Sequence, residues 1–304
     1  MREILDALPA GSPEWHEQRR FRVGGSEVAA ILGLSPWESA FSLWHRKAGN
    51  VPFDPMDDNE ALYWGRVHEP AIRAEFAKRH ADTHHEDHEI GLVVALDGFA
   101  LASPDSVVSR KGADWGVECE VLEIKTDRFG DGWGEPGTDQ IPIQYVCQAQ
   151  WYMGVLGLPL ARFAVLVGGA EYREYVLPFD PDGFRLMYDA ARDFVQSLRD
   201  GIAPPLDGSD QTYQTVRALH PEIDRGEQHD LTAELADRFL DAKRAKDAAD
   251  YDYRRTSSEV LDAMGQAQHA YHPDGYRIAY RTARGDSAPF LVADKQALTQ
   301  RNAA

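Results

Sequence analysis

The stretch VECEVLEIK occupies residues 117–125 and decides the fold prediction. Its apolar run from Val117 to Ile124 predicts a buried strand. Because side chains alternate between the two faces of a strand, Glu123 and Lys125 point to one side and Ile124 to the other. A carboxylate and an ammonium are therefore expected on one face of an interior strand. The alternative is a Glu that faces solvent, which the apolar neighbours disfavour.

A second acidic segment, Ser103-Pro104-Asp105, precedes this strand. Asp after Pro is a common turn residue, which is the simplest interpretation of Asp105 alone. Together with Glu123 and Lys125, it predicts two carboxylates and a lysine at neighbouring strand ends. Carboxylate oxygens are the ligands that Mg²⁺ prefers, often with substrate phosphates as further ligands. The pattern therefore indicates metal-assisted phosphodiester cleavage.

Further polar residues lie on predicted helices. A helix from about Asn59 to His80, with Asn59 as its N-cap, presents Glu69 as a possible third carboxylate, or as an ordinary exposed helix residue. A later helix carries Gln148 on a polar stripe with Gln144 and Tyr152, because these residues are spaced by four. Gln is common on helices, so this stripe is the weaker signal.

A basic and glycine-rich region near the start contains Arg19 and, seven residues later, Ser26. Ser26 begins a short helical pattern that ends at Gly33, so it either caps that helix or binds an anion there. The next segment, Ser35-Pro36-Trp37-Glu38, predicts a helix start with Ser35 as the cap. Two hairpins are predicted, around Asp97-Gly98 and around Gly168-Gly169.

These motifs, in this order, resemble the YqaJ-like viral recombinase family, relatives of phage lambda exonuclease within the PD-(D/E)XK nuclease superfamily. The resemblance covers roughly residues 15–200. It implies an α/β nuclease core with a mixed central sheet flanked by helices. We expect the core at residues 1–203, a linker at 204–230 and a helical and β appendage at 231–304.

The resemblance also implies roles for the metal site. Asp105, Glu123 and the carbonyl of Ile124 would hold Mg²⁺, with Mn²⁺ as a substitute, and Glu69 would join directly or through water. Lys125 would position or deprotonate the attacking water. Gln148 would orient that water or Lys125.

The expected substrate is the end of linear double-stranded DNA, degraded 5′→3′, with Arg19, Ser26 and Ser103 holding a phosphate. Family members form ring-like homo-oligomers and act with a single-strand annealing protein, which is the expectation here. Two alternatives stay open: a structure-specific or restriction-type endonuclease on the same core, and a DNA- or protein-binding module without catalysis.

Composition limits the function class. A chain of 304 residues can form one or two domains. No apolar run is long enough for a membrane helix, the first residues lack the apolar segment of a secretory signal, and only two cysteines occur, so a cytoplasmic protein is expected. The net charge of −18 disfavours nonspecific DNA binding. Two interpretations remain. The one expected here is a local basic path for DNA, made of Arg19, Arg20, Arg22, Arg46, Lys47 and Arg66; the other is a chain that does not bind DNA.

Overall fold

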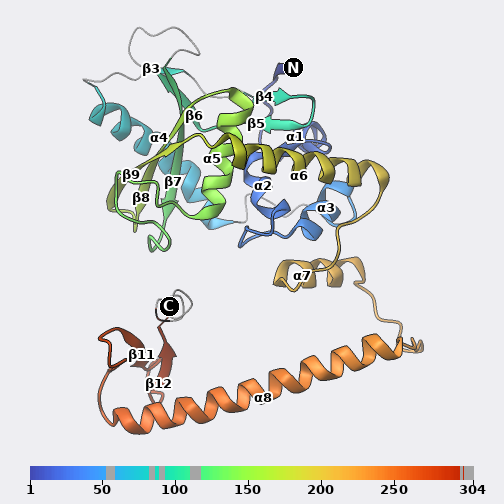
Figure 1. The fold of residues 1–304 in the computed structure, drawn as a ribbon, viewed down its shortest axis with the longest axis vertical. Helices are drawn as coiled ribbons and strands as arrows, with labels where there is room; N and C mark the ends of the chain where they lie inside the picture. Colours follow the sequence, from blue (N-terminus) through green and yellow to red (C-terminus); the bar gives the residue numbers. More distant parts are fainter. Residues whose placement is uncertain (53–58, 82–85, 89–92, 110–117, 295–296, 298–304) are drawn as a thin grey trace. The chain divides into compact units, whose positions relative to one another are not determined.

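The computed structural model describes the chain except residues 53–58, 82–85, 89–92, 110–117, 295–296 and 298–304 (Figure 1). The chain divides into two compact units, Met1–Ile223 and Asp224–Ala304. No helix among the described residues is long and apolar enough to cross a membrane.

The main sheet of the first unit has five strands in the order β3-β6-β7-β8-β9. These strands are β3 (Glu86–His88), β6 (Ser106–Ser109), β7 (Cys119–Asp127), β8 (Leu160–Val167) and β9 (Glu171–Pro178). Only β7 and β8 are parallel, and the helix α5 (Ile143–Leu156) connects them, as a parallel pair requires. The predicted strand ending at Ile124 is β7, although Val117 lies outside the described residues. The hairpin at Gly168-Gly169 is confirmed as β8–β9.

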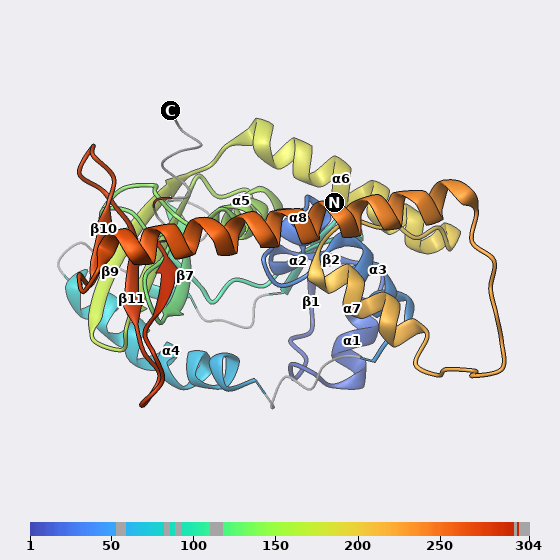
Figure 2. The same cartoon turned by 90° about the horizontal axis from the view of Figure 1, so that it is seen from below.

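Helices cover both faces of this sheet. On one face, α4 (Glu60–Arg79) packs Ile72 and Phe76 against Leu122 and Ile124 of β7. On the other face, α5 buries Ala149, Trp151 and Met153 in the larger core. The alternation expected for β7 is therefore confirmed, since Glu123 has no exposed surface. Figure 2 shows α4 along one side of the unit and α6 (Pro181–Asp200) along the other.

A smaller sheet completes the first unit, with the order β1-β4-β5-β2. Its strands are β1 (Arg2–Leu5), β2 (Val23–Gly24), β4 (Val93–Leu96) and β5 (Ala100–Ala102). The β4–β5 hairpin is confirmed: Asp97 and Gly98 have φ of 50° and 77°, as a tight hairpin turn requires. The short helices α1 (Pro13–Arg19), α2 (Gly25–Ile31) and α3 (Ala40–Ala48) precede this hairpin in the chain.

The expected helix start at Ser35 is wrong. α3 begins at Ala40 and Ser39 is its N-cap, because Ser39 and Ser42 bond each other's backbone N–H groups in a capping box. Ser35 instead closes a turn, in which its Oγ accepts hydrogen bonds from the N–H groups of Trp37 and Glu38.

The segment 204–230, expected as a linker, contains the helix α7 (Asp210–Leu219). α7 packs on α3, and a buried hydrogen bond of 2.7 Å joins Thr212 Oγ1 to Ser39 Oγ. This tertiary contact assigns α7 to the first unit, which ends at Ile223.

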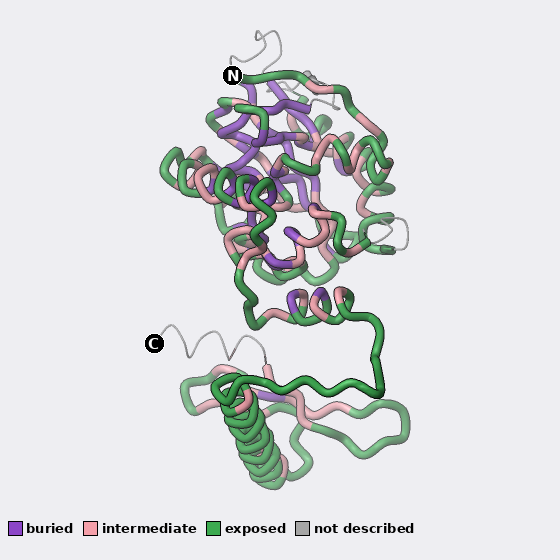
Figure 3. Tube along the Cα trace, turned by 90° about the vertical axis from the view of Figure 1, so that its right-hand side faces the viewer, coloured by how far each residue is buried: buried purple, intermediate pink, exposed green. Residues whose placement is uncertain are grey.

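The second unit consists of the long helix α8 (Ala233–Met264) and a sheet of β10 (His269–Tyr271), β11 (Arg277–Thr282) and β12 (Phe290–Ala293). This confirms the expected helical and β appendage. None of the α8 residues is buried, and Figure 3 colours the helix almost wholly as exposed. The mixed α/β core and its flanking helices are likewise confirmed.

Candidate active site

Strand pairing brings the two carboxylates together. β6 and β7 are antiparallel with Ser106 opposite Leu122, so the next step of the ladder places Asp105 opposite Glu123. The Asp105 Oδ2 atom accepts a hydrogen bond of 2.7 Å from the backbone N–H of Ile124. The N–H of Asp105 donates to Glu123 Oε1 at 3.4 Å. Asp105, the residue directly before β6, is thus held beside the Glu123 carboxylate of β7.

Lys125 lies next to both carboxylates. Its Nζ atom is 2.6 Å from Glu123 Oε2 and 3.7 Å from Asp105 Oδ2. Burial opposes the charge of this ammonium, but Glu123 and Asp105 outweigh burial and raise the pKa of Lys125 above its ordinary value. The ammonium also lies 5.5 Å from the ring centroid of Tyr145 on α5. Lys125 is therefore held as a cation at a defined position.

The acidic pair is suited to a hard cation. Burial, followed by repulsion from Asp105, raises the pKa of Glu123 to about 7. The Lys125 ammonium balances one negative charge of the two carboxylates, and a divalent ion bound by oxygens of both Asp105 and Glu123 would offset the other. The donor set of Asp105, Glu123 and the Ile124 carbonyl fits Mg²⁺ chemistry, because all of its atoms are oxygens.

Glu69 lies near this pair without joining it. Its Oε1 atom accepts a hydrogen bond of 2.6 Å from Arg73 Nη2, which also donates to the backbone carbonyl of Asp105. Burial and the nearby Asp105 raise the pKa of Glu69. Within the described ranges no three His, Cys, Asp or Glu side chains form a group that could hold a metal ion. The geometry therefore supplies two carboxylates with a third close by.

Gln148 lies on α5, where its Nε2 atom donates a hydrogen bond of 3.2 Å to the hydroxyl of Tyr152. Burial and the charge of Glu123 raise the pKa of Tyr152, which keeps this hydroxyl neutral beside the acidic pair. The polar stripe expected on this helix thus faces the Glu123 side of β7. Gly25 of α2 permits this arrangement, since a Cβ there would lie 2.5 Å from the Tyr152 ring.

Two of the three expected phosphate ligands lie together. Arg19 Nη2 donates to Ser103 Oγ at 3.4 Å, and the guanidinium stacks 4.1 Å from the ring centroid of Trp15. Ser26 is exposed in the first turn of α2. Gly24 is the N-cap of that helix, so the interpretation of Ser26 as the cap is wrong. Among the described residues no hydrogen bond joins Ser26 to Arg19 or Ser103.

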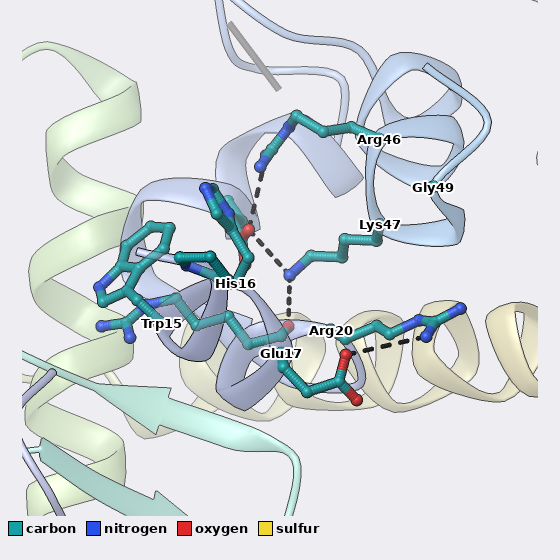
Figure 4. Close-up of a pocket in the computed structure, with 10 residues that line it drawn as sticks. Trp15, His16, Glu17, Arg20, Arg46, Lys47 and Gly49 are labelled. Carbon is teal, nitrogen blue, oxygen red and sulfur yellow. Dashed lines mark hydrogen bonds and ion pairs between the residues drawn. The ribbon is translucent and has the colours of Figure 1, made fainter. Parts of the chain in front are cut away.

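A buried lysine fixes the backbone that carries Arg19. Lys47 Nζ donates to the carbonyls of Arg19 at 2.9 Å and Arg22 at 2.7 Å, and it pairs with Glu27 Oε1 at 2.8 Å. Glu27 Oε2 in turn accepts the N–H of Gly24 at 2.9 Å. Lys47 and Arg46 both pair with Glu27 Oε1, at 2.8 and 3.5 Å, and both cations line a cavity of about 220 Å³ (Figure 4).

The basic path expected on the surface is therefore partly internal. Lys47 is 4% exposed, and Arg46 pairs with both Glu27 and Glu38. Their charges are neutralised within the fold, because buried charges require partners. Sequence reasoning also missed Arg73, which contacts Glu69 and the Asp105 carbonyl, and Tyr145, whose ring lies beside the Lys125 ammonium. The spacing of Glu69 and Arg73 by four on one helix, and of Tyr145 and Gln148 by three, could have indicated both.

Residues 14–159 match the family model of the YqaJ-like viral recombinase domain. The chain is 31% identical over 231 residues to the uncharacterized protein YqaJ of Bacillus subtilis strain 168, covering 74% of this chain and 69% of that protein. It is 32% identical over 146 residues to protein D345L of African swine fever virus, isolate Tick/Malawi/Lil 20-1/1983, covering 47% of this chain and 40% of that protein.

Among solved structures, an alkaline exonuclease (LHK-Exo) from Laribacter hongkongensis matches with 19% identity and a TM-score of 0.46. The match covers 69% of this chain and 100% of that chain.

Proposed function

The chain belongs to the YqaJ-like viral recombinase family, and on that premise we propose that it is a Mg²⁺-dependent nuclease of the PD-(D/E)XK superfamily that degrades linear duplex DNA from its ends. The observation that carries the proposal is the contact of buried Glu123 with the partly buried Asp105 and Lys125, at the junction of β6 and β7.

The acidic pair would hold the metal. Asp105, Glu123 and the carbonyl of Ile124 are the proposed ligands, Mn²⁺ is a proposed substitute, and Glu69 is proposed to join directly or through water. When bound, the metal supplies Lewis-acid polarisation of the phosphate and a more acidic water. Arg73 keeps Glu69 oriented toward this region through its bond to Glu69 and to the Asp105 carbonyl.

Lys125 positions the attacking water and stabilises negative charge on the phosphate. Its ammonium is fixed by Glu123 on one side and lies over the Tyr145 ring on the other, so it loses little freedom when substrate binds. Gln148 orients that water from α5, with its amide held by Tyr152.

The proposed direction of degradation depends on recognition of a terminal 5′ phosphate. Arg19 and Ser103 share a hydrogen bond and supply one cation and one hydroxyl, and Ser26 adds a hydroxyl at the start of α2. We propose 5′→3′ degradation from such an end. Action in the cytoplasm as a homo-oligomer, with a single-strand annealing protein as partner, belongs to the same proposal.

The test compares an end-labelled linear duplex with the same DNA as a covalently closed circle. Mg²⁺ should support release of nucleotides from the linear DNA only, and a chelator should abolish it. Lys78→Ala serves as the control variant, because Lys78 is 79% exposed and lies on α4 away from the acidic pair. Cleavage of the circle would favour an endonuclease, and undiminished cleavage in chelator would contradict the metal site.

A further inference from the structure

Trp37 is a large aromatic side chain that is 61% exposed, in the turn between α2 and α3. Single exposed aromatic rings are common on protein surfaces, so exposure alone carries no argument. Two further observations concern this ring: its contacts with the aromatic residues beside Lys125, and the hydrogen bonds that fix its turn.

A chain of aromatic contacts links Trp37 to the proposed catalytic lysine. The ring centroids of Trp37 and Tyr145 are 5.9 Å apart. Tyr145 stacks on Trp133 at 5.5 Å, and the Lys125 ammonium lies 5.5 Å from its ring centroid. Trp133 is buried and donates its indole N–H to Asp127 at the end of β7. Trp37 is thus separated from Lys125 by one ring, and it is the exposed member of the group.

The turn that carries Trp37 is held by several independent bonds. Ser35 Oγ accepts the N–H of Trp37 at 3.2 Å, and the carbonyl of Pro36 accepts the side-chain amide of Gln211 at 2.8 Å. The buried bond between Ser39 and Thr212 fixes the start of α3 directly after the turn. An aromatic side chain on a fixed turn loses little entropy on binding, which favours contact with a ligand.

We propose that the exposed face of Trp37 stacks on a nucleobase of the DNA strand whose phosphate lies at Lys125. This inference rests on the proposed nuclease function and adds the base contact that holds the strand during cleavage. Stacking suits an enzyme that must accept successive bases of any sequence, because every base presents a π-face. Trp37 is therefore a positioning residue. Gln211 and Thr212 of α7 act indirectly, because they hold the turn that carries Trp37.

The experiment measures binding of a fluorescent, 5′-phosphorylated linear duplex to the full chain, with Ca²⁺ in place of Mg²⁺ so that the DNA stays intact. Trp37→Ala should raise the Kd about 5- to 150-fold, the range for loss of one base-stacking ring. Trp37→Phe keeps a ring and should retain most of the affinity. Tyr213→Ala is the matched control, since Tyr213 is 64% exposed on α7, and it should leave the Kd unchanged.

An abasic nucleotide placed in turn at each terminal position of the strand sharpens the test. At the stacked position, loss of the base should weaken binding to the unchanged protein and should add nothing to the effect of Trp37→Ala. Fully additive losses at every position would overturn the inference, as would an unchanged Kd for Trp37→Ala. A lower molar mass of that variant with an unchanged Kd would assign the ring to contact between copies of the chain instead. If the unchanged protein neither binds nor cleaves any duplex, the proposed function fails first, and the inference fails with it.

Discussion

Replacing Lys47 by Met tests whether the buried network at α2 and α3 holds the first unit together. Met keeps most of the apolar stem of Lys47 and removes its ammonium. The side chain is 2% exposed, and its Nζ atom bonds two backbone carbonyls and Glu27, whose side chain is 12% exposed. The substitution therefore leaves a nearly buried carboxylate with one cationic partner fewer.

The expected loss of unfolding free energy depends on the partners that Glu27 keeps in the Lys47→Met variant. Breaking a buried ion pair costs about 3–5 kcal/mol, because the remaining charge stays desolvated. Glu27 still has Arg46 at 3.5 Å and the Gly24 N–H at 2.9 Å, which places the expected loss near the lower end, at about 3 kcal/mol. Arg19 and Lys47 both line the cavity, so we expect water to replace the ammonium at the Arg19 carbonyl, and the loss of that bond should add little.

The assay is urea unfolding followed by tryptophan fluorescence. All seven tryptophans lie before residue 152, so this signal reports on the first unit alone. Lys78→Met is the matched control: Lys78 is 79% exposed, and the change should alter the free energy of unfolding by less than about 0.5 kcal/mol. The double variant Lys47→Met with Glu27→Gln should lose less than the sum of the two single losses, because the isolated charge is gone. Equal losses for the Lys47 and Lys78 variants, or strict additivity in the double variant, would refute the reasoning.

Four further outcomes are expected. Lys125→Ala should lower turnover by about 10²- to 10⁴-fold while duplex binding is kept, and near-normal turnover would remove Lys125 from the mechanism. Arg19→Ala should slow digestion of 5′-phosphorylated ends far more than of 5′-hydroxyl ends, whereas an equal loss would indicate general backbone contact. Gly25→Ala should cost about 1–3 kcal/mol in unfolding free energy, because its Cβ would lie 2.5 Å from an aromatic ring, while Gly208→Ala, with open space around it, should be neutral. Burial opposes the charge of Glu27, but Lys47 and Arg46 outweigh burial and lower the pKa of Glu27. The charged Glu27 therefore stabilises the fold above its unfolded-state pKa of about 4.3, and this stabilisation is lost as the pH falls through the folded-state pKa. Glu27→Gln should flatten the acid limb of the stability curve in that window, and an unchanged acid limb would count against this assignment.

The order of elements in the first unit follows largely from local sequence. The alternation around Glu123 predicted the two faces of β7, and Asp97-Gly98 and Gly168-Gly169 predicted their hairpins. These features depend on residues close in the chain, whose spacing and backbone preferences act over a few positions. The prediction for the start of α3 was wrong, because local sequence offers two serines as caps. The contact that favours Ser39 is with Thr212 of α7, a residue far away in the sequence.

The environment of each side chain was decided by tertiary packing. The sequence alone predicted that Asp105, Glu123 and Lys125 form one group. The two-residue spacing places Glu123 and Lys125 on one face of a strand, and the family motifs add Asp105. Only the folded structure places Arg73 between Glu69 and Asp105, buries Lys47 against Glu27, and sets Trp37 one ring away from Lys125. These contacts join segments that are separated by loops of many residues, and burial and register, not local preference, select which of them form.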